Sequence, residues 1–272
     1  MNQNIIEPKW LIPDSKKNTN HSWNKDHDQY SDRVFSLTAD PELCQTLIAD
    51  LPNLAGANVL IPGCGSEISL QAKILELCPN IGHVVSTDFS QQAIAKSSSD
   101  WKSRLHRINS SNASKFEFLE ADSTRLSQDR PEWEGKFDYV LVVNSVLSDV
   151  DTHNRQMLAE FHRILKPNGK LYGFFPTVFC GVEIDLLTFG QNKRLNSGEI
   201  DLISSTLYEK KQDCYQIFYT PLRLKQIFRE IGFNRLNFEI FFCESEYFNS
   251  KDIYGIDDLD ICIWEFLVRL QK

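Results

Sequence analysis

Several features that mark other classes of protein are missing from this chain of 272 residues. No stretch approaches the ~20 consecutive apolar residues that cross a membrane. The first residues, Met1 to Asn4, lack the basic and then apolar order of a signal peptide. The seven cysteines are scattered, and no two of them are spaced as Cys-x-x-Cys. This pattern favours reduced thiols in a cytoplasmic protein over disulfides or structural zinc.

The chain also lacks an excess of basic residues. It has 29 Lys and Arg against 37 Asp and Glu, which gives a formal net charge of −8. An acidic chain has little general attraction for nucleic acid or for an anionic membrane, so we expect neither as a partner. Hydrophobic residues make up 42%, as in ordinary soluble globular proteins. The length allows one large domain, or one domain with a sizeable insertion.

Short apolar runs alternate with helical patterns between residues 58 and 175. Asp151 is in position to cap the last of these helices. Alternation of this kind predicts a mostly parallel sheet covered by helices on both faces. The expected strands are 59–62, 83–87, 116–120, 137–143 and 170–175, and the expected helices are 68–78, 90–107 and 151–165.

The remaining segments add three features to this plan. Residues 1–39 are polar but carry Trp23 and Tyr30, and we expect an N-terminal cap or lid, because aromatic side chains are costly to expose. Residues 40–272 form the main domain, within which residues 177–215 break the alternation. We expect this break to be an insertion of short helices or loops over the strand ends. A helix at 221–231, ended by Gly232, and an antiparallel strand pair at 235–243 and 261–270 complete the chain.

The most informative feature is the turn after the first expected strand, Pro62-Gly63-Cys64-Gly65-Ser66-Glu67. Gly63 and Gly65 lack a Cβ, so the backbone can take unusual dihedral angles and a ligand can approach closely. The helix behind the turn offers unpaired N–H groups. The combination suits a nucleotide-like ligand, although Gly-x-Gly by itself is also typical of a plain strand–helix turn.

Polar residues follow the other expected strands at the same edge of the sheet, where open α/β sheets bind their ligands. Asp88 ends the second strand, 25 residues after Gly63, where a carboxylate can accept both hydroxyls of a ribose. Asp122 and Ser123 follow the third strand, and Asn144 and Ser145 follow the fourth. Simpler alternatives stay open: Asp88 as a helix cap, Asp122 as a solvated loop residue and Asn144 as a polar strand end.

Together these segments resemble the core of the class I, Rossmann-like S-adenosylmethionine-dependent methyltransferases. The resemblance covers roughly residues 40–270 and leaves 177–215 unmatched. The matching segments are the glycine motif (59–67), the acidic ribose motif (84–90), the adenine motif (120–122), the fourth-strand motif (137–144), the signature before strand five (163–171) and a later helix (218–233).

The resemblance implies a seven-stranded, mostly parallel, doubly wound sheet, S-adenosylmethionine as cofactor and methyl transfer as the activity. Two positions depart from the family pattern. Ile61 stands where an acidic residue is usual, and Glu67 stands where glycine is usual, so the contacts to the methionine moiety are the least defined. The residues that the resemblance assigns to the cofactor are Gly63, Cys64, Gly65, Glu67, Asp88, Phe89, Asp122, Ser123, Asn144 and Ser145, with Trp23 and Tyr30 from the lid.

The methyl acceptor is less well determined than the cofactor. The fourth-strand motif lacks the Asn/Asp-Pro-Pro-aromatic form used for planar amino groups, and the acidic charge disfavours RNA. We expect O- or N-methylation of a small metabolite. Two alternatives stay open: methylation of a peptide or protein, and a non-catalytic S-adenosylmethionine-binding module.

The candidate catalytic residues are Asp149 and His153, which follow strand four, where substrate often lies in the family. Capping or surface roles are the alternatives for both. Catechol-type magnesium chemistry would need several carboxylates near strands four and five, and Asp149 and Asp151 are the only close pair. We therefore predict no metal site, and the sequence leaves the oligomeric state open.

Overall fold

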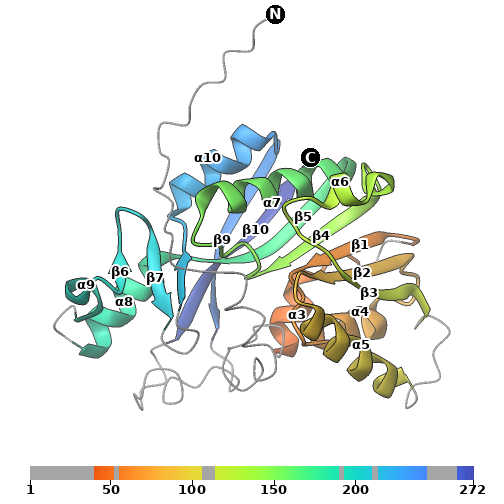
Figure 1. Ribbon diagram of the computed structural model, residues 1–272, viewed down its shortest axis with the longest axis horizontal. Coiled ribbons are helices and arrows are strands. Elements are labelled where there is room, and N and C mark those ends of the chain that lie inside the picture. The colour runs from red at the N-terminus through yellow and green to blue at the C-terminus, as the bar shows by residue number, and fades with distance from the viewer. Residues whose placement is uncertain (1–39, 52–54, 106–113, 190–192, 210–213, 244–261) are drawn as a thin grey trace, which may run out of the picture.

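The computed structural model describes residues 40–51, 55–105, 114–189, 193–209, 214–243 and 262–272. The expected N-terminal lid, with Trp23 and Tyr30, lies outside these residues. Within them, a seven-stranded sheet has helices on both sides (Figure 1), as the sequence predicts. No helix in the described ranges combines the length and the apolar character needed to cross a bilayer.

Strands and helices alternate through the first part of the chain. The helix α3 begins after Asp40, whose side chain caps the N–H groups of Glu42 and Leu43. The elements up to the third strand are α3 (Pro41–Leu47), β1 (Asn58–Pro62), α4 (Ser69–Leu77), β2 (His83–Asp88), α5 (Gln91–Leu105) and β3 (Phe116–Glu120).

The second part of the chain keeps the alternation and then closes the sheet with two antiparallel strands. Gly232, with φ of 113°, ends the helix α10 as predicted. The elements are α6 (Leu126–Asp129), the 3-10 helix η5 (Pro131–Trp133), β4 (Phe137–Val143), α7 (Asp151–Ile164), β5 (Leu165–Pro176), α10 (Pro221–Ile231), β9 (Arg235–Cys243) and β10 (Ile263–Gln271).

The strand order of the sheet is β3-β2-β1-β4-β5-β10-β9. Strands β1 to β5 run parallel, whereas β10 pairs antiparallel with both β5 and β9. The chain moves outward from β1 to β3 and then returns to β4 on the other side of β1. The order therefore reverses between β1 and β4, and ligands of such sheets bind outside the strand ends at this point.

Two apolar layers hold the helices against the sheet. Along β4, Val140 and Val142 face a core shared with α7 and α10, while Tyr139 and Leu141 face a core shared with α3 and α4. Alternate residues of a strand point to opposite faces, so a continuous apolar run is what a strand buried on both faces requires. Figure 1 shows α6, α7 and α10 on one side of the sheet and α3, α4 and α5 on the other.

The insertion after β5 is more regular than the sequence indicated. The expected short helices are present, but three strands that were not expected also form an antiparallel sheet in order β6-β7-β8. Ile200 and Leu207 from this sheet pack against Val178. Strands this short and this polar give little periodic signal. The elements are α8 (Val178–Phe189), α9 (Lys193–Ser197), β6 (Ile200–Asp201), β7 (Thr206–Glu209) and β8 (Cys214–Ile217).

The strand expected at residues 170–175 begins earlier, at Leu165, and residues 166–169 are part of it. Phe137 of β4 pairs with Leu165, and Tyr139 then pairs with Lys170, so the register shifts between them. Asn168 has a φ of 64°, in the left-handed region that Asn tolerates better than most residues. Residues 166–169 therefore form an irregularity at the start of β5.

Asp151 is not the helix cap that the sequence suggested. Val150 occupies the N-cap of α7 without a side-chain hydrogen bond. The Asp151 side chain, 1% exposed, instead accepts from the Tyr219 hydroxyl and forms an ion pair with Arg155 at 2.7 Å. Arg155 also reaches Glu230 of α10 at 2.8 Å. A buried carboxylate needs such partners, and here they tie α7 to the start and the end of α10.

Two tyrosine substitutions should show that a hydrogen bond to a buried carboxylate stabilises the fold more than one to an exposed carboxylate. Tyr219→Phe leaves the buried Asp151 carboxylate without one donor and should lower the free energy of unfolding by about 1–3 kcal/mol. Tyr172→Phe removes a hydrogen bond to Asp50, whose side chain is 49% exposed, and should cost less than about 1 kcal/mol, because water replaces the donor. Urea unfolding of the two variants measures both values, and equal losses would contradict this account.

Candidate functional site

The glycine loop after β1 passes directly over the end of β4. Gly63 and Gly65 both have a φ of 61°, in the left-handed region that favours glycine. A Cβ added at Gly63 would lie 2.4 Å from the Cβ of Ser145. Glycine at residue 63 is thus required by the backbone conformation and by the contact with β4, independently of any ligand.

Asp88, at the end of β2, holds this loop in place. Its Oδ2 accepts from the Gly65 N–H at 2.9 Å and its Oδ1 from the Ser90 N–H at 2.9 Å. The Thr87 carbonyl also accepts from the Cys64 N–H at 2.9 Å. Each carboxylate oxygen has more than one lone pair and can accept more than one hydrogen bond. The helix-capping hydroxyl is that of Ser90, which accepts from the Ala93 N–H at 3.3 Å.

Two residues extend this edge toward β3. The Ala121 N–H donates to the Asp88 carbonyl at 2.9 Å, which brings the loop of Asp122 and Ser123 beside the end of β2. Asp122 is exposed, and its Oδ1 accepts from the N–H and the hydroxyl of Thr124 at 2.8 and 2.7 Å. Phe89 is 39% exposed, so an aromatic ring face is available next to Asp88.

Unpartnered polar atoms gather at the same edge. Seven buried side-chain nitrogen or oxygen atoms in the described residues have no hydrogen-bond partner there. Buried polar atoms are almost always hydrogen-bonded, so this concentration marks where a polar ligand fits. The five that belong to the strand-end edge are Ser66 Oγ, Thr87 Oγ1, Asn144 Oδ1, Ser145 Oγ and Glu265 Oε2.

Glu265 also lies at this edge, although sequence reasoning did not assign it to the candidate site. It lies on β10 opposite Pro176, the last residue of β5, and is only 4% exposed. Its Oε1 accepts from the Asn144 Nδ2 at 2.9 Å. Burial raises the pKa of Glu265 to about 8, while the hydrogen bond from Asn144 acts in the opposite direction. The signal was present in the sequence as a single carboxyl group within the apolar run Ile263–Leu267.

The other predicted residues of the glycine loop are close to this cluster. Glu67 is half-buried between Ser66 and the start of α4. The Cys64 thiol donates to the Gly65 carbonyl at 3.4 Å. Burial of the sulfur and the neighbouring Asp88 carboxylate raise the pKa of Cys64 well above its usual range. A neutral thiol is a poor nucleophile, so Cys64 is not suited to act as one.

The two candidate catalytic residues lie in different surroundings. Asp149 is 4% exposed in the loop between β4 and α7, and this loop is fixed by Asn154, which bonds both the N–H and the carbonyl of Ser148 at 2.9 Å. His153 is exposed in the first turn of α7. A catalytic role for either stays a prediction.

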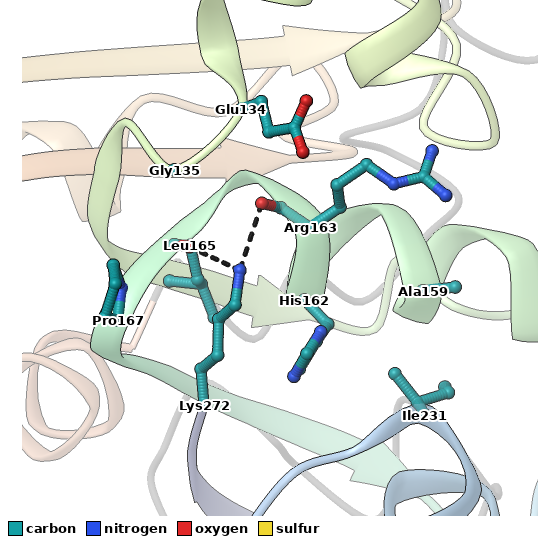
Figure 2. A pocket seen from close by; sticks show the side chains of 9 residues that line it. All are labelled: Glu134, Gly135, Ala159, His162, Arg163, Leu165, Pro167, Ile231 and Lys272. Atoms are coloured by element: carbon teal, nitrogen blue, oxygen red, sulfur yellow. Dashed lines mark hydrogen bonds between the residues drawn. The ribbon is translucent and has the colours of Figure 1, made fainter.

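A cavity of about 470 Å³ lies at the opposite edge of the sheet, where β4 and β5 begin (Figure 2). The Lys272 ammonium in its wall donates to the carbonyls of Arg163 and Leu165 at 3.2 and 2.8 Å. Ligands of open parallel sheets bind at the carboxyl ends of the strands, so this cavity is not the cofactor site. Its lining is Glu134, Gly135, Ala159, His162, Arg163, Leu165, Pro167, Ile231 and Lys272.

Glu265 should make stability depend on pH. Below about pH 4.5, its usual pKa, the carboxyl is neutral in the folded and the unfolded chain. Between there and about pH 8 the unfolded chain releases a proton that the folded protein keeps. The free energy of unfolding, relative to Glu265→Gln, should therefore fall with rising pH by up to about 1.4 kcal/mol per unit and level off above pH 8. Urea unfolding at a series of pH values measures the difference, and parallel curves would contradict the assigned burial.

Part of the chain is similar to a known protein family, and its fold is similar to that of solved structures. Residues 63–171 match the model of a family described as "Methyltransferase domain". This stretch begins at the glycine loop and ends within β5, so it contains the ends of β2, β3 and β4. No curated protein matches the chain.

Solved structures share the fold at low sequence identity. A methyltransferase from Methanosarcina mazei is 18% identical, with a TM-score of 0.54 over 80% of this chain and 93% of its own. The magnesium protoporphyrin IX methyltransferase of Synechocystis PCC 6803, with bound SAH, is 13% identical, with a TM-score of 0.54 over 93% of both chains. A putative methyltransferase in complex with the Haloferax volcanii Trm112 activator is 16% identical, with a TM-score of 0.56 over 94% and 97%. The matched family, the strand order and the similar solved structures together show that residues 63–171 are a methyltransferase domain within a Rossmann-like methyltransferase fold.

Proposed function

We propose that this enzyme transfers the methyl group of S-adenosylmethionine to an oxygen or nitrogen of a small metabolite. The observation that carries the proposal is the row of unpartnered buried polar atoms beside the glycine loop. Asp88 would bind the ribose hydroxyls, Asp122 the adenine amino group and Phe89 the face of the ring. The backbone of the glycine loop, together with Ser66 and Glu67, would hold the methionine end.

The protein's part in the reaction is to align the acceptor with the methyl group and to exclude water. When bound, the cofactor supplies an electrophilic methyl group on a sulfonium. Positioning of an acceptor in line with that group can contribute about 7–11 kcal/mol toward lowering the barrier. The rigid loop contributes to it, since Gly63 is packed on Ser145 and Gly65 is bonded to Asp88. An acceptor hydroxyl also has to lose a proton, for which Asp149 and His153 are the candidate bases.

The insertion supports an acceptor of small size and partly apolar character. It follows the carboxyl end of β5, and Figure 1 shows α8, α9, β6 and β7 gathered at one side of the molecule, away from α4 and α5. Trp264 of β10 fixes it through the Glu183 carboxylate at 2.6 Å and the Cys180 sulfur at 3.3 Å. Its large exposed apolar side chains are Phe179, Leu186, Leu187, Leu202 and Ile203.

A structural relative fits the same class of acceptor. The Synechocystis enzyme is described as acting on magnesium protoporphyrin IX, which is a small molecule with a large apolar ring. Apolar side chains beyond β5 would pack on such a substrate, whereas a peptide backbone would need hydrogen-bonding partners.

Replacement of Asp88 tests the cofactor site. Asp88→Ala removes the anchor of the Gly65 N–H and the acceptors proposed for the ribose, so the affinity for S-adenosylmethionine and S-adenosylhomocysteine should fall at least about tenfold. Isothermal titration calorimetry measures both affinities. The matched control is Asp201→Ala, an acidic turn residue of the insertion whose bonds are to Ile203 and Ser204, and its affinities should equal those of the unmodified protein. An unchanged affinity in Asp88→Ala would show that the ribose lies elsewhere.

A substrate panel tests the acceptor class. The full chain with methyl-labelled S-adenosylmethionine should label phenols, alcohols or amines of small molecular mass and leave denatured peptides unlabelled. Label found on peptides alone would replace a metabolite by a peptide acceptor. Cofactor binding in the ~1 μM–1 mM range usual for enzymes, without any labelled product, would support the non-catalytic module instead.

A further inference from the structure

The buried carboxyl of Glu265 has no role in the fold that its surroundings explain. It is 4% exposed, and in the described residues only its Oε1 has a partner, the Asn144 amide at 2.9 Å. A buried carboxylate with an unsatisfied oxygen destabilises a fold, and a well-packed apolar side chain on β10 would avoid that cost. Groups kept in such surroundings are concentrated at functional sites.

The sheet places this carboxyl on the far side of the cofactor site from the adenosine end. The proposed function gives Asp88 and Asp122 to the nucleoside; Asp88 ends β2 and Asp122 follows β3. The glycine loop then crosses from β1 onto Ser145, next to Asn144 at the end of β4. A cofactor that starts at β3 and runs along this edge would reach β4 with its sulfonium end, where Asn144 is hydrogen-bonded to Glu265.

We propose that Glu265, held through Asn144, is the negative group that lets this site distinguish the positively charged sulfonium of S-adenosylmethionine from the neutral thioether of S-adenosylhomocysteine. The inference rests on the proposed function, because it needs the cofactor at this edge. Attraction between opposite charges is strong in a partly buried site, where water screens it little. The carboxylate favours the cofactor before transfer and loses its partner once the sulfonium has become a thioether, which favours release of the product.

Two of the thiols around Glu265 stay neutral near pH 7 and do not compete with its charge. The thiols of Cys180 and Cys243, on α8 and β9, and that of Cys262 lie around it. Burial raises the pKa of Cys180 to about 12 and that of Cys243 still further, so both stay neutral. The carboxyl groups that also act on these thiols are Glu183, bonded to the Trp264 indole, and Asp40, the cap of α3.

The direction of the pH effect follows from linkage. Burial raises the pKa of Glu265 to about 8, so its charge appears as the pH rises through that value. A sulfonium prefers the charged form of the carboxyl, and a thioether has no such preference. The ratio of the dissociation constants, Kd of S-adenosylhomocysteine over Kd of S-adenosylmethionine, should therefore increase between pH 6.5 and 9 by about tenfold, which corresponds to about 1.4 kcal/mol.

Calorimetric titration of both ligands into the full chain and into Glu265→Gln, at a series of pH values, measures this ratio. The amino groups of the two ligands titrate in the same range, and Glu265→Gln contains only that contribution. We expect the ratio to rise more steeply in the unmodified protein than in Glu265→Gln. The matched control is Glu239→Gln, which neutralises a carboxyl group on β9 whose side chain is 48% exposed, and it should follow the unmodified protein.

A second variant keeps the test decisive if Glu265→Gln does not fold. Asn144→Gly tolerates the φ of 47° found at that position and removes the hydrogen bond that lowers the pKa of Glu265, so the midpoint of the rise should move to higher pH. Coincident ratio curves for the unmodified protein and Glu265→Gln, or an unmoved midpoint in Asn144→Gly, would overturn the assignment of Glu265 while leaving the proposed function intact. Failure of both ligands to bind the unmodified protein would overturn the proposed function itself.

Discussion

The contact between the glycine loop and the end of β4 is the constraint on which the rest of the site depends. Gly63 lies so close to Ser145 that a single added carbon would collide with it. Gly65 is bonded to Asp88 at the end of β2, so the loop bridges the two strands on either side of β1. The loop, the strand order and the acidic residue therefore specify one another, and a change in any of them displaces the cofactor site.

The same edge shows how a stable sheet carries a reactive site. Two apolar layers cover most of the sheet, one on each face. The helices α7 and α10 are joined through Asp151, which bonds both Tyr219 and Arg155. The unsatisfied polar atoms are concentrated instead where the parallel strands end. Packing elsewhere in the domain provides the stability that leaves these atoms free to bind a ligand.

Much of this arrangement was predictable from local patterns. The run Phe137–Val143 coincides with β4, since a strand buried on both faces has to be continuously apolar. Gly232 ended α10 where a left-handed residue was expected. The insertion was predicted less well, because strands as short as β6 and β7 carry too few alternating residues to be distinguished from loops. Asp151 was misassigned for a related reason: the residue that draws it away from the helix end, Tyr219, is 68 positions distant.

The sequence by itself determined the class of fold, the glycine loop and the acidic residues at the strand ends, because each depends on neighbours within a few positions of the chain. Only the tertiary structure brought Glu265 to the edge where the proposed site lies. Its partner Asn144 is 121 residues away in sequence, and the two meet because β10 inserts antiparallel beside β5 and brings its first residues to the edge where the parallel strands end. Burial and the electrostatic character that follows from it are properties of that assembled edge, and no local pattern contains them.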